Sequence, residues 1–244
     1  MSALAAARPA SIGDRIDALD WPSLGRELDA EGAALIPGLL TREECADAIR
    51  LYSQADVFRK QVDMARHAFG QGEYKYFAYP LPGLVEDLRH GLYRHLAPVA
   101  NRWNDLLSAP ARFPPDLAAF LERCRRAGQT KPTPLVLKYG PGDYNRLHQD
   151  LYGEHVFPIQ VAILLSQPGL DFTGGEFVTT EQRPRMQSRV EVAPLARGDA
   201  LAFAVNHRPA MGPRGAYRVQ MRHGVSRVRS GSRLTLGVIF HDAA

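Results

Sequence analysis

From Pro134 to its last residue the chain is a succession of short strand-like runs, and this pattern restricts its fold more than any other feature. Proline and glycine pairs such as Pro-Gly, Gly-Gly and Ser-Gly mark turns between the runs. Many short strands with no helices between them indicate an antiparallel barrel or sandwich such as a jelly roll. The predicted strands lie at 135–139, 144–150, 157–165, 175–180, 199–205, 217–228 and 233–241.

Before this region the apolar residues recur mainly at helical spacing. Residues 83–107 carry leucines, a valine and a tryptophan at steps of three and four, which predicts one long helix. A strand-like run at 33–40 precedes Thr41 and Glu44, whose spacing is that of a capping box at a helix start. Asp116 is the predicted start of another helix.

The two patterns predict an α+β fold with a change of character near residue 132. We expect residues 1–132 to form a helical support region with an early strand and residues 133–244 to form the β-barrel. A chain of 244 residues is long enough to bury a substantial core. We therefore expect the two regions to pack as one continuous structural domain.

The composition excludes several other classes of protein. Cys45 and Cys124 are the only cysteines and stand far apart, so the sequence indicates neither a disulfide framework nor a zinc knuckle. Because no apolar run approaches the roughly 18 residues that cross a membrane, we expect a soluble, cytoplasmic protein without a membrane partner.

Arginine is concentrated in residues 183–233. This segment holds eleven arginines, no lysine and two acids, Glu191 and Asp199, for a formal charge of +9. It can face an anionic partner such as DNA or RNA. In the alternative interpretation its arginines pair with acids elsewhere in the fold, and the sequence does not separate the two.

His148 and Asp150 form the strongest candidate for a metal site. On a strand, side chains two residues apart point to the same face, so an imidazole and a carboxylate lie side by side. A non-haem Fe(II) site needs a second histidine from a distant strand. His-x-Asp alone also arises by chance, as an ordinary polar pair on the surface.

Four later histidines are candidates for the third ligand. His223 lies in a strand-like run, whereas His207 lies in the sequence NHRPAMGPRG, which predicts a proline- and glycine-rich loop. Because rigid elements hold ligands best, we prefer His223. We interpret His155 and His241 as structural or surface residues.

Arg233 heads an apolar strand, and Thr235 lies on the same face two residues later. A buried guanidinium is costly unless it meets an anion. A dicarboxylate cosubstrate would supply one through a bidentate pair.

With these residues in order, the chain resembles the Fe(II)- and 2-oxoglutarate-dependent dioxygenases. The matching pieces are Tyr139, the His148–Asp150 pair, GGEF at 174–177, RGDALAF at 197–203, HGV at 223–225, and Arg233 with Thr235. The resemblance implies a double-stranded β-helix, which is a jelly roll. It further implies that His148, Asp150 and His223 bind the iron, and that Arg233, Tyr139 and Thr235 bind 2-oxoglutarate.

Within this superfamily the chain is most similar to bacterial oxygenases assigned to oxidative repair of damaged DNA. The segment YGPGDYNRLHQD is close to that of alkylated-DNA-repair dioxygenases, although Leu137 and Ile239 stand where those enzymes usually have an asparagine and a second arginine. The ten-residue gap from His223 to Arg233 and the GGEF turn are more similar to prolyl 4-hydroxylases.

The resemblance implies an enzyme that oxidises a C–H bond with O₂ and releases succinate and CO₂. Dealkylation of nucleic acid is the expected activity, with Tyr144 and Tyr152 as candidates to stack on a base. Hydroxylation of a prolyl or other protein residue is the alternative. A metal-free β-barrel binding module would leave the His-x-Asp pair and Arg233 unexplained.

Overall fold

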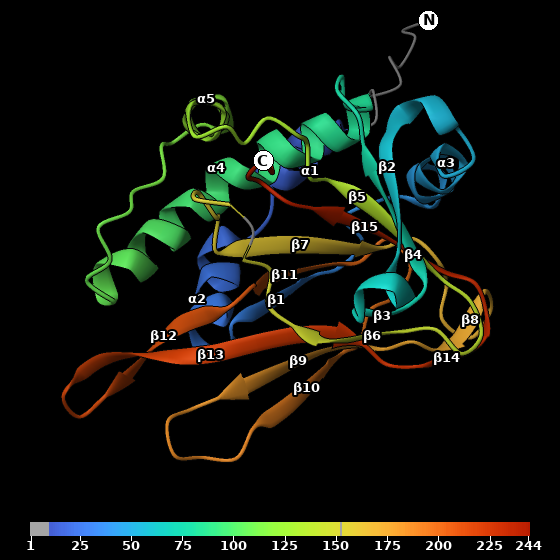
Figure 1. Cartoon of the computed structure of the whole chain (residues 1–244). Coiled ribbons are helices and arrows are strands. Elements are labelled where there is room, and N and C mark those ends of the chain that lie inside the picture. The colour runs from blue at the N-terminus through green and yellow to red at the C-terminus, as the bar shows by residue number, and fades with distance from the viewer. Residues whose placement is uncertain (1–9, 152) are drawn as a thin grey trace, which may run out of the picture.

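The structure is a computed structural model that describes residues 10–151 and 153–244. Two antiparallel sheets face each other, and helices cover the outer face of the larger sheet (Figure 1). The helices are α1 (Ile12–Asp17), α2 (Trp21–Glu31), α3 (Arg42–Leu51), α4 (Gly83–Leu106) and α5 (Leu117–Arg126), with short 3₁₀ helices η1 (Ala55–Val57) and η2 (Met64–His67).

The larger sheet has the order β1-β11-β7-β15-β5-β4-β2, and the smaller has the order β10-β9-β13-β6-β3, with β12 paired to β13. A separate pair joins β8 and β14. The strands are β1 (Ala33–Ile36), β2 (Phe58–Asp63), β3 (Gly70–Gln71), β4 (Glu73–Phe77), β5 (Leu135–Tyr139), β6 (Tyr144–His148), β7 (Ile159–Leu164), β8 (Phe172–Gly174), β9 (Phe177–Gln182), β10 (Arg189–Ala193), β11 (Ala200–Ala204), β12 (His207–Gly212), β13 (Gly215–Val225), β14 (Val228–Gly231) and β15 (Arg233–Val238).

This topology confirms the predicted double-stranded β-helix. Each predicted run between residues 135 and 241 contains a strand of the two facing sheets. The run predicted at 217–228 merges β13 with the first residue of β14, and the run predicted at 144–150 ends at His148. Asp150 therefore lies two residues beyond β6 rather than on it.

The strands of the larger sheet place alternate residues in two separate cores. On β7, Ile159, Val161 and Ile163 pack towards the helices, whereas Ala162 and Leu164 face the space between the sheets. β15 follows the same rule, with Leu234 and Leu236 on the helix side. Arg233 and Thr235 consequently face the barrel interior, because side chains alternate along a strand.

The N-terminal region agrees with the expected helices and adds strands that were not expected. The early strand is β1, Thr41 and Glu44 form the capping box, and α4 and α5 lie where the periodicity predicts them. In addition, β2 and β4 extend the larger sheet and β3 joins the smaller one. Because strands from both sides of residue 132 share these sheets, the division there stays a prediction.

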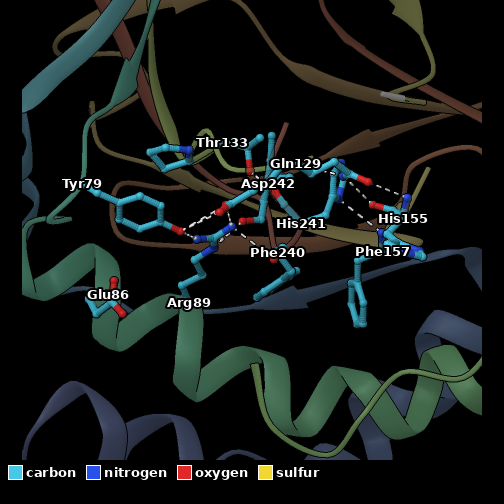
Figure 2. Close-up of polar contacts among 12 residues, drawn as sticks. Tyr79, Glu86, Arg89, Gln129, Thr133, His155, Phe157, Phe240, His241 and Asp242 are labelled. Atoms are coloured by element: carbon cyan, nitrogen blue, oxygen red, sulfur yellow. Dashed lines mark hydrogen bonds and ion pairs between the residues drawn. The ribbon is translucent and has the colours of Figure 1, made fainter. Parts of the chain in front are cut away.

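A buried polar network fixes the C-terminal segment to α4 (Figure 2). The Arg89 guanidinium donates to the carbonyl oxygens of Ile239 and Phe240 at 2.8 and 3.2 Å and to the Asp242 carboxylate at 2.7 Å. It also donates to the Tyr79 hydroxyl, which in turn donates to Asp242. Arg89 is 1% exposed, so these bonds satisfy a charge that is almost wholly removed from water.

The same network reaches the chain segment that follows the predicted metal site. The Gln129 amide donates to the carbonyl oxygens of His155 and Asp242 and accepts from the His155 amide (Figure 2). His241 accepts from the Phe157 amide through Nδ1, and burial lowers its pKa to about 4, with Arg89 adding to the shift. His241 is thus a buried structural residue.

Among the described residues, no helix is long and apolar enough to cross a membrane.

Candidate metal centre

The pairing of β6 with β13 brings the three predicted metal ligands together. His148 is the last residue of β6 and lies directly opposite His223 on β13. The Asp150 carboxylate oxygens lie 3.5 Å from Nε2 of His148 and 3.5 Å from Nε2 of His223. One ligand atom from each residue falls within 4.8 Å of the others, and these three form the one such His, Cys, Asp and Glu group found in the described parts of the chain.

The environments of His148 and Asp150 favour the forms that bind metals. His148 Nδ1 lies 2.7 Å from the carbonyl oxygen of Arg146, which can only accept, so Nδ1 carries the proton and Nε2 keeps a free lone pair. Burial lowers the pKa of His148, and the neighbouring His223 adds to this. Burial raises the pKa of Asp150, but the His223 and His148 contacts outweigh it and hold the pKa at about 2. Neutral imidazole and ionised carboxylate are the forms that bind metals.

Aromatic rings and an amide surround the ligands inside the barrel. The Phe203 ring centroid lies 4.6 Å from that of His223, and the Phe177 ring stacks on His223 at 6.0 Å. Gln160 on β7 is 5% exposed, and its amide helps lower the pKa of Asp150. Sequence reasoning did not identify Gln160 or Phe203. The available signal for Gln160 was a lone amide inside the apolar run of β7.

Arg233 lies in the same barrel interior, opposite Tyr139 of the neighbouring strand β5. Its guanidinium is 1% exposed and donates to the Thr235 hydroxyl at 2.6 Å, while Nε has no partner. No carboxylate in the described residues comes within ion-pair distance of it, and burial lowers its pKa to about 10. A buried cation without a counter-ion is costly, so this position suits an anionic ligand.

The GGEF turn passes close to this guanidinium. Gly175 has a φ of +65°, and a Cβ there would lie 2.8 Å from Val228 Cγ2 and 3.0 Å from Arg233 Cδ. Only glycine fits both the left-handed backbone and the close approach. The turn thereby closes the barrel around Arg233.

The structure describes one of the two tyrosines that were expected to stack on a substrate base. Tyr144 begins β6, four residues from His148, or roughly 13 Å along the strand. Its ring lies 5.8 Å from the Arg227 guanidinium. The structure thus does not place Tyr144 beside the ligands, and its role in stacking stays a prediction. Tyr152 lies outside the described residues.

The other histidines considered from the sequence are not part of the ligand group. His207 is the first residue of strand β12, so the prediction of a loop there is wrong. Strand β12 pairs only with β13, and an edge strand tolerates Pro209 because the missing amide is not needed for a second ladder. His155 bonds through its backbone to Gln129 and, like the buried His241, is structural.

The alternative interpretation of the arginine-rich segment, in which its arginines pair with acids, holds for part of it, and the anionic partner stays a prediction. Arg183, Arg189, Arg197 and Arg208 form ion pairs with carboxylates, the last of them with Glu181 in a buried contact. Six others are exposed and form no ion pair within the described ranges, and these are Arg185, Arg214, Arg218, Arg222, Arg227 and Arg229. The exposed arginines lie on β13 and the β12–β13 hairpin, on the β9–β10 connection, and on β14 and the residue before it.

Comparison with known proteins identifies the family. Residues 72–243 match the model of the family Oxygenase-NA, described as "Oxygenase, catalysing oxidative methylation of damaged DNA". Two uncharacterized proteins of Mycobacterium tuberculosis, MT2286 and Rv2227, are each 49% identical over 168 residues, covering 69% of this chain and 72% of theirs.

Solved structures show the same fold at low identity. A prolyl hydroxylase from Trichoplax adhaerens, solved with a peptide fragment of hypoxia inducible factor, has a TM-score of 0.56 and 15% identity over 91% of this chain and 89% of that one. A 2OG-Fe(II) oxygenase family oxidoreductase from Burkholderia pseudomallei has a TM-score of 0.51 and 16% identity over 93% and 94%. The chain belongs to the Oxygenase-NA family and is an oxygenase with the double-stranded β-helix fold of the 2-oxoglutarate- and iron-dependent enzymes.

Proposed function

We propose that this chain is an Fe(II)- and 2-oxoglutarate-dependent dioxygenase that removes alkyl groups from damaged nucleic acid. The observation that carries the proposal is the ligand group His148, Asp150 and His223 in the same barrel interior as the unpaired Arg233. Two histidines and one carboxylate are the donor set of non-haem Fe(II) oxygenases, which leaves positions for cosubstrate and O₂.

The residues present fit both absent groups. His148 and His223 offer Nε2 atoms and Asp150 offers a carboxylate oxygen to the metal. Arg233 Nε is buried without a partner, which suits the distal carboxylate of 2-oxoglutarate. When bound, Fe(II) supplies the oxidation of a substrate C–H bond by O₂, coupled to conversion of 2-oxoglutarate into succinate and CO₂.

The protein's own part is to bind, orient and exclude water. Arg233 and the Thr235 hydroxyl would hold the cosubstrate carboxylate, and Tyr139, opposite Arg233 on the neighbouring strand β5, would add a further bond through its hydroxyl. Phe203 and Phe177 fix the His223 ring and keep that side of the site apolar. Because these side chains are already in place and water is excluded on this side, they need to move little during the reaction.

The family description directs the proposal to nucleic acid. An oxygenase acts on a C–H bond that is already present, so we take a methyl group on a base as the group that is oxidised. Hydroxylation of an N-methyl group gives N–CH₂OH, which releases formaldehyde and restores the N–H. We further propose a cytoplasmic location, which agrees with two free, buried cysteines.

A screen for succinate release tests this function. N-methylated DNA is expected to stimulate succinate formation, with formaldehyde released in equal amount. Unmethylated DNA of the same sequence is the control and is expected to give neither product above background. Succinate release with prolyl peptides, without formaldehyde, would instead support a protein hydroxylase, the activity that the printed names of some neighbours of similar fold carry.

Replacing Arg233 with alanine is expected to raise the 2-oxoglutarate concentration for half-maximal activity about 10- to 100-fold, since a hydrogen bond to a charged group contributes about 1.5–3 kcal/mol. Arg233→Lys keeps the positive charge but loses the paired N–H donors of the guanidinium that bind a carboxylate at two points. We therefore expect a half-maximal 2-oxoglutarate concentration between those of the wild type and Arg233→Ala. Anaerobic calorimetric titration of 2-oxoglutarate into the metal-loaded protein measures the same loss without turnover. If Arg233→Ala and the wild type bind 2-oxoglutarate with equal affinity, Arg233 is not part of the cosubstrate site. Arg229 is exposed on β14, so Arg229→Ala is the matched control and is expected to keep the wild-type affinity.

A further inference from the structure

A polar groove of about 550 Å³ lies beside the proposed metal centre. One wall comes from the β9–β10 connection with Arg185, and another comes from the β12–β13 hairpin with His207 and Arg218. Figure 1 shows that this connection and this hairpin extend from the barrel in the same direction. The groove thus lies between these two extensions and the segments that carry Gln149 and Asn206.

The groove shares its chain segments with the metal ligands. Gln149, which lines it, stands between His148 and Asp150 in the sequence. The Gln149 amide donates to the carbonyl oxygens of Asn206 and Met221, both at 2.8 Å. Met221 is two residues from His223, so the groove and the ligands are held by the same two segments.

The lining of the groove is cationic and rich in amides. Among the described residues that line it there is no carboxylate, and Pro184 is the one apolar residue. Arg183 is neutralised by Glu181 at 2.6 Å, but Arg185 and Arg218 form no ion pair in the described part of the chain. Because Arg185 and Arg218 have no carboxylate partner there, the groove carries an uncompensated positive charge. Burial lowers the pKa of His207, and the charge of Arg218 lowers it further.

We propose that this groove binds the phosphate backbone of the nucleic-acid strand that carries the substrate base. Guanidinium and amide side chains are the groups that contact phosphate oxygens in nucleic-acid complexes. The described lining residues include no carboxylate that could bind a basic peptide, whereas their cationic and amide side chains suit phosphate oxygens. The inference rests on the proposed nucleic-acid substrate and adds the surface that positions it.

Binding of a short, unmodified, fluorescein-labelled single-stranded DNA, followed by fluorescence anisotropy, tests the groove without turnover. In the Arg185→Gln, Arg218→Gln double variant, affinity is expected to fall about 10- to 30-fold near 0.1 M salt, because each lost phosphate contact removes about 0.7 from the slope of log K against log salt. The total slope is expected to fall by about 1.4.

The matched control is Arg125→Gln, Arg126→Gln, which removes the same charge from exposed positions on α5. This control is expected to keep the wild-type slope. If the groove variant binds DNA with the wild-type affinity and slope, the groove assignment is overturned, while succinate release on methylated DNA would leave the proposed function intact.

Two further outcomes distinguish an acidic peptide from DNA as the occupant of the groove, and failure of the groove proposal from failure of the proposed function. If poly-glutamate displaces the labelled DNA at lower concentration than an unlabelled oligonucleotide does, the groove serves an acidic peptide and the inference is wrong. If the wild type neither binds DNA nor releases succinate with methylated DNA, the nucleic-acid function and the groove are overturned together.

Discussion

Replacing His148 with alanine is expected to weaken metal binding strongly and to abolish succinate release. His148 supplies one of the three protein ligands, and the remaining pair, Asp150 and His223, would leave the metal with two. The loss of Nε2 also removes a group that helps hold the pKa of Asp150 near 2. Activity should fall to the uncatalysed background, measured as succinate from 2-oxoglutarate, and Mn²⁺ binding followed by electron paramagnetic resonance should weaken in parallel.

His90→Ala is the control for this experiment. His90 lies on α4, is largely exposed and contacts Glu86 at 2.9 Å. It is not part of the barrel strands that carry the metal ligands. It is expected to retain the metal affinity and turnover of the wild type. Full coupled turnover by a His148→Ala, Asp150→Ala double variant would refute the ligand assignment.

Most of the site could be predicted from the sequence because its members obey local rules. His148 lies within the predicted strand 144–150, His223 lies in another, and Arg233 heads an apolar strand. Asp150 was expected on the same strand as His148 but lies two residues beyond the end of β6. Local rules cannot show that these residues meet in the fold. That expectation came from the order of the motifs along the chain, which matches the dioxygenase family. The oxygenase family and the double-stranded β-helix are confirmed by the family match and by the topology.

The strands that escaped prediction have weak local patterns. Every residue of β10 from Arg189 to Val192 is exposed, so there is no alternation of buried and exposed positions for the sequence to display. β12 contains Pro209, which argued for a loop, yet β12 is an edge strand. β2 and β4 form by pairing with each other and with β5, which follows about 60 residues after β4 in the chain, and such long-range pairing leaves little local signal.

Gln160 and the groove escaped prediction for a related reason. Their roles depend on which side chains meet across the barrel, such as Gln160 with Asp150, and single-sequence reasoning does not supply those distances. The excess of arginine was visible in the sequence. The sequence did not show which of these arginines form ion pairs and which are free. That depends on where acids such as Glu181 and Asp171 lie in the fold.

The second large effect concerns stability, and it comes from Arg89. Replacing Arg89 with methionine keeps much of the side-chain volume but leaves the Asp242 carboxylate, which is 5% exposed, without its cation. Removing one partner of a buried ion pair costs about 3–5 kcal/mol. For a chain of this size the melting temperature should fall by about 6–20 °C, since 1 kcal/mol shifts it by about 2–4 °C. Thermal and urea unfolding measure the change.

A double-variant cycle separates the charge from the other bonds of the network. Asp242→Asn in the Arg89→Met background removes the stranded carboxylate, so part of the lost stability should return, and the two substitutions should not be additive. Full recovery is not expected, because the Ile239 and Phe240 carbonyl oxygens still lack the Arg89 donors. If the two substitutions simply add, Arg89 acts through those carbonyl bonds and packing rather than through its charge. The network also joins Gln129 to His155, so loosening it should increase amide hydrogen exchange in the segment that follows Asp150 while the barrel strands stay protected.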